Sequence, residues 1–278
     1  MRAPGPPCQC QPERSEGAHA RMLPFAEFIL SEANGLRVTV LLLLGSSLTA
    51  AAQEPEHIAD NSFLIEEAYN QEAGVVQHIN NFVHEEAGDS WLYVFTQEWP
   101  LGGIRHQLSY TVPLVSPEGF GAGLGDILVN YRYQAVGDGQ SSLHVAPRLS
   151  LVLPTGSEDN GRGSGAVGMQ GNLPVSYEVH NAVEVHFNTG FVLDGESGAF
   201  DARLGASGVL RVHPRFNVLL ETAWGSDEDI VFLNPGVRWA IDAGSLQIVP
   251  GLAYPIALTS GASDAFFLYL SLEHPFRH

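Results

Sequence analysis

Ten charged side chains at alternate positions of otherwise apolar segments could bind or steer a polar or ionic group. Five are glutamates and five are arginines: Glu98, Arg132, Arg148, Glu178, Glu184, Arg203, Arg211, Glu221, Arg238 and Glu273. Each falls on the parity opposite to the apolar residues of its segment, and successive side chains of a strand point to opposite faces. Charges in a confined space persist when they are paired or hydrated. The set therefore predicts lumen-lining residues that form either a hydrogen-bonded plug of side chains or a narrow polar channel.

Serine and histidine residues would supply hydrolytic or metal chemistry if they were suitably spaced. Ser164 and Ser197 lie in glycine-containing segments, but neither belongs to a Gly-x-Ser-x-Gly motif. The histidines are scattered without the spacing of metal ligands: they include His78, His84, His106, His144, His180 and His186. The acidic run Asp227–Asp229 could bind Ca²⁺, but such a run is more typical of a solvated surface. We therefore predict no enzyme, no cofactor and no metal site.

Twelve segments of alternating apolar and polar residues, about 10 residues each, position these side chains. They are Val75–Val83, Trp91–Trp99, His106–Leu114, Asp126–Ala135, Leu143–Leu153, Met169–Val179, Val183–Leu193, Asp201–Val212, Phe216–Trp224, Ile230–Ala240, Leu246–Ala257 and Ala265–His274. This length suits a tilted membrane-spanning strand, and lipid tolerates no unpaired sheet edge. The pattern predicts an all-β fold, a transmembrane antiparallel up-and-down β-barrel of about 12 strands over residues 75–278.

The connections between these segments alternate in length. Tight turns are expected at Leu101–Gly103, Gly137–Gln140, His180–Asn181, His213–Arg215 and Asp242–Gly244. The longest connections are Val115–Gly125 and Thr155–Gly168, and we expect the second to be too glycine-rich and polar to pack. Short periplasmic turns and longer external loops are typical of such barrels, and an even strand number puts both termini in the periplasm.

A soluble β-sandwich or soluble barrel would show similar strand spacing. Against that alternative, whole strand faces are apolar, as at Val183, Val185 and Phe187. Aromatic residues near the strand ends are also placed to form girdles at the membrane interface. We therefore expect outer-membrane lipid and lipopolysaccharide to surround the barrel.

The chain before the first strand divides into two parts. No stretch approaches the ~18 consecutive apolar residues of a spanning helix. The apolar run Val38–Leu44 follows Arg37 and precedes an Ala-x-Ala site, which predicts an export signal cleaved near Ala52. Residues 1–52 are then expected to comprise this signal, preceded by an N-terminal extension that results from a mis-assigned start codon. Residues 53–74 are expected to form a periplasmic segment or a plug.

Charge and cysteine content limit the partners. The net charge is −18 and lysine is absent, which argues against nucleic acid because its binding requires neutralised phosphates. Cys8 and Cys10 both precede the predicted cleavage site, so no disulfide is expected. The last strand ends near an aromatic residue, Phe276, which resembles the signal that the outer-membrane assembly machinery reads. That machinery is therefore an expected partner.

Five segments in order carry a family resemblance. They are Phe63–Glu72, Thr96–Pro100, His106–Tyr110, Gly125–Gln134 and Leu153–Gly156. Over most of residues 60–190 the chain resembles the family described as "Putative MetA-pathway of phenol degradation", whose members are often labelled transporters. The resemblance implies a barrel of the cell outer membrane that admits aromatic or other hydrophobic compounds.

Two hypotheses for function follow. The leading one is a porin-like channel for passive uptake of small, hydrophobic or aromatic solutes, steered by the lumen charges. The alternative is a closed structural or adhesive barrel that acts through its external loops, chiefly residues 115–125 and 155–168. A solute-dependent uptake defect on deletion would distinguish the channel from the structural barrel.

Overall fold

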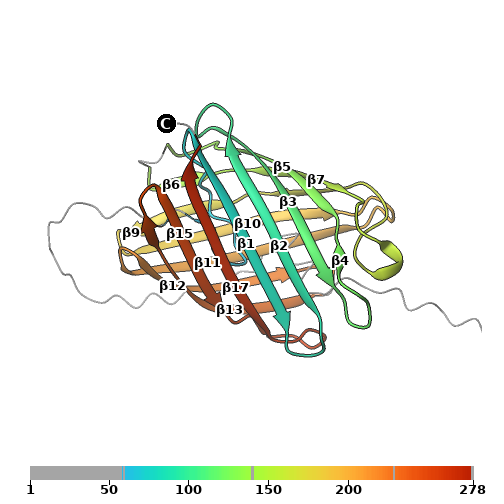
Figure 1. Cartoon of the computed structure of the whole chain (residues 1–278). Helices are drawn as coiled ribbons and strands as arrows, with labels where there is room; N and C mark the ends of the chain where they lie inside the picture. Colours follow the sequence, from blue (N-terminus) through green and yellow to red (C-terminus); the bar gives the residue numbers. More distant parts are fainter. Residues whose placement is uncertain (1–57, 59, 139–140, 228, 277–278) are drawn as a thin grey trace, which may run out of the picture.

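The structure is a computed structural model that describes residues 58, 60–138, 141–227 and 229–276 (Figure 1). The predicted export signal with its cleavage near Ala52, and the cysteines Cys8 and Cys10, lie outside the described residues.

The described residues form one antiparallel sheet of seventeen strand segments. They are β1 (Val75–Glu85), β2 (Trp91–Pro100), β3 (His106–Ser116), β4 (Gly123–Leu124), β5 (Ile127–Tyr133), β6 (Leu143–Val145), β7 (Arg148–Leu153), β8 (Gly168–Asn172), β9 (Val175–His180), β10 (Val183–Leu193), β11 (Phe200–His213), β12 (Phe216–Gly225), β13 (Ile230–Trp239), β14 (Ile241–Ala243), β15 (Leu246–Ala253), β16 (Ile256–Ala257) and β17 (Ala265–Pro275). A single 3-10 helix, η1 (Glu158–Asn160), lies between β7 and β8 within the described chain. No helix among these residues is long and apolar enough to cross a membrane.

Several segments are parts of one span. A proline has no N–H to donate, and the ladder is interrupted at Pro147 between β6 and β7, at Pro174 between β8 and β9, and at Pro255 between β15 and β16. Further breaks separate β4 from β5 and β13 from β14. Joined across these five breaks, the seventeen segments of the described chain make twelve spans.

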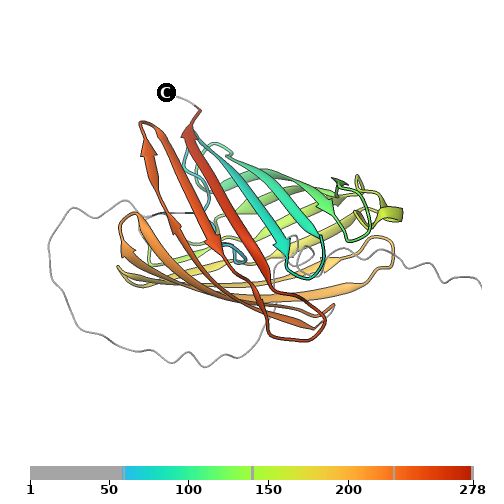
Figure 2. The same cartoon turned by 60° about the horizontal axis from the view of Figure 1, so that its bottom comes forward.

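The barrel closes between its first and last strands. β1 pairs with β17 along its whole length, from Val75 opposite Pro275 to Glu85 opposite Ala265. This closure leaves no sheet edge exposed, as lipid requires (Figures 1 and 2). The predicted twelve-strand barrel is confirmed, and β10 (Val183–Leu193) has the predicted bounds.

The alternation of side chains separates an outer apolar face from the lumen. In β17, Phe266 and Leu268 are 52% and 48% exposed, whereas Phe267 and Tyr269 are 1% and 3% exposed. The exposed set forms the face that meets lipid. The buried set points into the barrel, where it packs with the segment that precedes β1.

The external loop between β7 and β8 is packed, so the expectation that it would not pack is wrong. Asp126 accepts hydrogen bonds from Gly156 N (2.9 Å), Ser164 N (2.7 Å) and Ser164 Oγ (2.8 Å). A Cβ on Gly156 would lie 2.1 Å from the carbonyl oxygen of Arg162. The glycines therefore allow backbone segments to approach closely, and a buried carboxylate holds them together.

Candidate functional site

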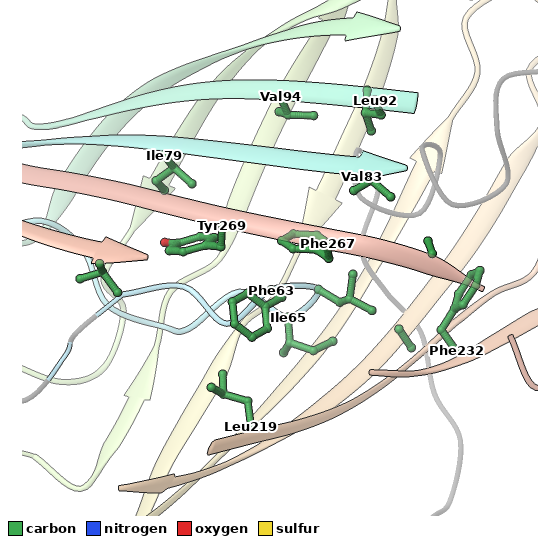
Figure 3. Packing of buried hydrophobic residues seen from close by; sticks show 14 of the residues in the cluster. Phe63, Ile65, Ile79, Val83, Leu92, Val94, Leu219, Phe232, Phe267 and Tyr269 are labelled. Atoms are coloured by element: carbon green, nitrogen blue, oxygen red, sulfur yellow. The ribbon is translucent and has the colours of Figure 1, made fainter. Parts of the chain in front are cut away.

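Residues 58 and 60–71 lie inside the barrel and are called the plug here. Their side chains are deeply covered: Leu64, Ile65, Glu67 and Ala68 are each at most 1% exposed. Figure 3 shows Phe63 and Ile65 among side chains of the surrounding strands. The apolar residues of the plug are therefore buried against the barrel wall.

Polar side chains of the wall accept hydrogen bonds from the plug backbone. Leu64 N and Ile65 N donate to Glu221 Oε1 of β12, at 3.0 and 3.1 Å. Glu66 N donates to Asn188 Oδ1 of β10 at 3.0 Å, and Ala68 N donates to Ser176 Oγ of β9 at 2.7 Å. Asn70 N donates to Gln134 Oε1, directly after β5, at 3.0 Å, and Gln71 N donates to Gln107 Oε1 of β3 at 2.7 Å. The plug thus crosses the lumen from one side of the wall to the other. These six N–H groups thus have the partner that a buried N–H requires.

Two arginines of the wall bind plug carbonyl groups. Arg238 Nη1 donates to the carbonyls of Asp60 and Asn61, each at 2.8 Å. Arg132 Nη2 donates to Glu67 O at 3.1 Å and also to Tyr69 O. Both arginines are buried, so their positive charges are compensated by the plug rather than by water.

Glycines of the wall make room for the apolar residues of the plug. A Cβ on Gly236 or Gly251 would lie 2.3 or 2.5 Å from a ring carbon of Phe63. A Cβ on Gly205 would lie 2.1 Å from Ile65 Cδ1. The Phe63 ring also packs against the Phe267 ring, with 5.5 Å between the two ring centroids. Because no side chain fits at these positions with the plug in place, the wall is shaped to receive it.

The ten charged residues singled out in the sequence lie on these strands. They are Glu98 on β2, Arg132 on β5, Arg148 on β7, Glu178 on β9, Glu184 on β10, Arg203 and Arg211 on β11, Glu221 on β12, Arg238 on β13 and Glu273 on β17. Glu273, on the lumen parity, lies opposite Gln77 of β1 and Gln247 of β15.

Some of these charges pair with one another in the wall, and others pair with the plug. Arg211 joins two wall glutamates, with nitrogen–oxygen distances of 3.2 Å to Glu178 and 2.5 Å to Glu184. Arg148 and Arg132 instead meet Glu66 of the plug at 2.5 and 3.5 Å.

The remaining charges have other partners. Arg238 meets Glu67 of the plug at 3.0 Å, and Arg203 meets Asp227 at 2.5 Å. Glu98 accepts a hydrogen bond from Gln107 Nε2 at 2.6 Å. That these charges steer a solute stays a prediction.

A cavity of about 100 Å³ lies between the plug and one side of the wall. Its polar lining includes Thr96, Glu98, Asn130 and Arg148, and Ile65 of the plug borders it. These wall residues belong to β2, β5 and β7. The plug is therefore bonded to both sides of the wall, and some space remains between it and strands β2, β5 and β7.

The serines considered as nucleophiles close turns in external loops. Ser164 Oγ donates to Asp126 Oδ2 at 2.8 Å, and Ser197 Oγ donates to Asp194 Oδ1 at 2.6 Å. Among the histidines, His78 and His274 stack on the outer face with their Nε2 atoms 3.2 Å apart. His144 and His186 are buried in the wall.

Sequence reasoning missed the neutral residues that hold the plug. Gln107, Gln134, Ser176 and Asn188 all accept its backbone N–H groups. Their inward parity was visible in the sequence, as was that of the three glycines that seat the plug. Nothing in the spacing of these residues indicated that their partners are backbone N–H groups of the plug, which precedes the first strand.

Comparison with known proteins agrees with this architecture. The sequence profile of the family described as "Putative MetA-pathway of phenol degradation" matches residues 59–245. The fold is similar to an outer membrane channel from Pseudomonas putida F1, with a TM-score of 0.56 and 15% identity over 75% of this chain and 98% of that one. It is also similar to the KdgM porin, with a TM-score of 0.51 and 8% identity over 72% of this chain and 99% of that one. No curated protein matches the sequence.

Proposed function

Because this chain belongs to the family described as "Putative MetA-pathway of phenol degradation", we propose that it is an outer-membrane channel for passive uptake of small hydrophobic or aromatic solutes. Its fold, that of outer-membrane channels and porins, supports the channel role and the location. The side chains that line the lumen support the proposed class of solute.

Apolar side chains on the lumen side of the external half of the barrel carry the proposal. They are Val83, Leu92, Val94, Val115, Phe232 and Phe267, none more than 4% exposed. The interior of an outer-membrane barrel is ordinarily polar. Apolar area leaving water gains about 25 cal/mol per Å². These side chains pack against one another, so a solute must part them, and a ring or alkyl surface can replace their apolar contacts whereas a sugar cannot.

The polar cavity next to the plug supplies the next stage of the route. A hydroxyl or carboxylate on the solute would meet Thr96, Asn130 and Arg148 there while its apolar part contacts Ile65. The route runs beside β2, β5 and β7, because the cavity separates the plug from the wall there, although Arg132 and Arg148 of these strands also bond to the plug. Passage of a solute larger than this cavity would require the plug to shift.

The test compares permeation through the protein in liposomes for phenol and for a sugar. Replacing Phe232 by serine should lower phenol permeation several-fold and leave sugar permeation unchanged. Phe232→Leu, which keeps an apolar side chain, should behave like the natural protein. A folded, heat-modifiable barrel that passes neither solute would overturn the proposal. That result would favour the structural or adhesive barrel acting through loops 115–125 and 155–168.

A further inference from the structure

A carboxylate of the plug meets a carboxylate and an imidazole of the wall at one buried place. Glu67 of the plug, and Glu184 and His186 of β10, each offer one ligand atom, and these atoms lie within 4.8 Å of one another. We propose that the three side chains bind one divalent transition-metal ion, best matched by zinc, which fastens the plug to the wall. The site does not rest on the proposed function, although any effect of the ion on conductance would.

Each of the three side chains carries one buried atom without a hydrogen-bond partner among the described residues. These atoms are Glu67 Oε2, Glu184 Oε1 and His186 Nε2. The side chains are 1%, 2% and 0% exposed. The distance from His186 Nε2 to Glu67 Oε1 is 3.7 Å, too long for a hydrogen bond. Buried unsatisfied atoms each cost free energy, and a cation bound by these three side chains would offset that cost.

The other atoms of the same side chains are held by second partners. Glu67 Oε1 accepts from Arg238 Nη2 at 3.0 Å and from Ser62 Oγ at 2.9 Å. Glu184 Oε2 lies 2.5 Å from Arg211 Nη2.

The imidazole is held in the same way, because His186 Nδ1 lies 2.7 Å from Ser176 Oγ. With Nδ1–H donated to Ser176, Nε2 presents a lone pair to the site. Outer partners that orient ligands in this way are the rule in metal sites.

The two arginines near this place are shared with other partners. Arg211 also pairs with Glu178, and Arg238 also binds the backbone carbonyls of Asp60 and Asn61. In these ion pairs the carboxylates of Glu67, Glu184 and Glu178 stand against two guanidinium groups, which leaves a net negative charge for a cation to compensate.

The ligand types select the metal. A mixed imidazole and carboxylate set suits zinc and its neighbours, whereas Mg²⁺ and Ca²⁺ prefer oxygen ligands alone. Zinc holds such atoms at about 2.0–2.2 Å, which places tetrahedral ligand atoms about 3.3 Å apart. Binding would therefore draw the most distant ligand atoms together by at most about 1.5 Å. Because Glu67 is the one ligand from the plug, the ion would link the plug to β10.

The experiment measures zinc in the protein purified from the outer membranes of cells grown with added zinc. Elemental analysis should find about one zinc ion per chain. His186→Gln and Glu184→Gln should each weaken zinc binding at least about tenfold, since the loss of an outer partner alone has that effect, and the purified variants should retain little zinc. His144→Gln is the matched control, because this buried histidine has its Nε2 bonded to Ser141 O at 2.7 Å. His78→Gln is the control for zinc held by the histidine pair on the outer face.

The outcomes separate the site from its alternatives. The proposal would be overturned if the natural protein contained no zinc. It would also be overturned if zinc persisted in His186→Gln and disappeared in His78→Gln. If the site variants do not fold, cobalt in the natural protein decides, since a tetrahedral site gives an intense visible band and its absence would overturn the proposal. Metal content is measured without reference to conductance, so the channel proposal can fail while this one stands.

Discussion

Glu221 tests how the plug is held, because one of its oxygens accepts two plug N–H groups. Glu221 Oε1 lies 3.0 Å from Leu64 N and 3.1 Å from Ile65 N, and the side chain is 1% exposed. Its other oxygen, Oε2, accepts from Asn234 Nδ2 at 2.6 Å. Glu221→Ala would leave both plug N–H groups without an acceptor inside the barrel.

The expected size follows from the cost of the lost acceptor. A buried donor without a partner costs about 1–3 kcal/mol, so two cost about 2–6 kcal/mol. Even the lower value would raise the undocked fraction of the plug about 30-fold. Glu221→Gln keeps one oxygen as an acceptor, and Asn234 Oδ1, which has no partner among the described residues, can accept from the new amide. The glutamine variant should therefore retain a docked plug.

The assay places a cysteine at Ser62, which is 3% exposed, and measures its reaction with a membrane-impermeant maleimide. In the Glu221→Ala background the reaction should be about 30-fold faster or more. In the Glu221→Gln background it should match the parent protein. Equal rates in all three proteins would contradict the assignment of Glu221 as a plug anchor.

Two further predictions concern the glycines and the external loop. Gly236→Ala should destabilise the barrel by about 1–3 kcal/mol, because its Cβ would overlap the Phe63 ring. Thermal unfolding measures this, with Gly208→Ala as the control, since the nearest atom to a Cβ there is 4.0 Å away. Asp126→Ala removes three hydrogen bonds from the 154–167 loop and should speed tryptic cleavage after Arg162. Cleavage at the natural rate in that variant would mean that Asp126 does not hold the loop.

The barrel itself was predictable because lipid and lumen impose opposite chemistry on alternating residues. Phe266 and Leu268 face outward while Phe267 and Tyr269 face inward, and this period of two is written directly in the sequence. The interruptions at Pro147 and other prolines shorten the hydrogen-bonded segments without changing the number of spans.

The partners of the inward charges were not predictable in the same way. Which arginine meets which carboxylate depends on barrel register and on the path of the plug, and neither is encoded by local spacing. Glu184 and His186 are two residues apart on one strand face, but Glu67 joins them from far along the chain. The external loop was misjudged because glycine-rich composition suggests flexibility, whereas Gly156 and its neighbours permit close packing around Asp126.

The central claim is that the barrel is a channel obstructed by its own N-terminal segment. The most direct test measures conductance in a planar bilayer, for the natural protein and for a variant that lacks residues 53–70. The deletion removes Phe63, Glu66 and Glu67, and with them the contacts that cross the lumen. We expect the shortened barrel to conduct in larger discrete steps, and phenol on one side to block them. A correctly folded variant whose trace matches that of the natural protein would contradict the plugged-channel interpretation.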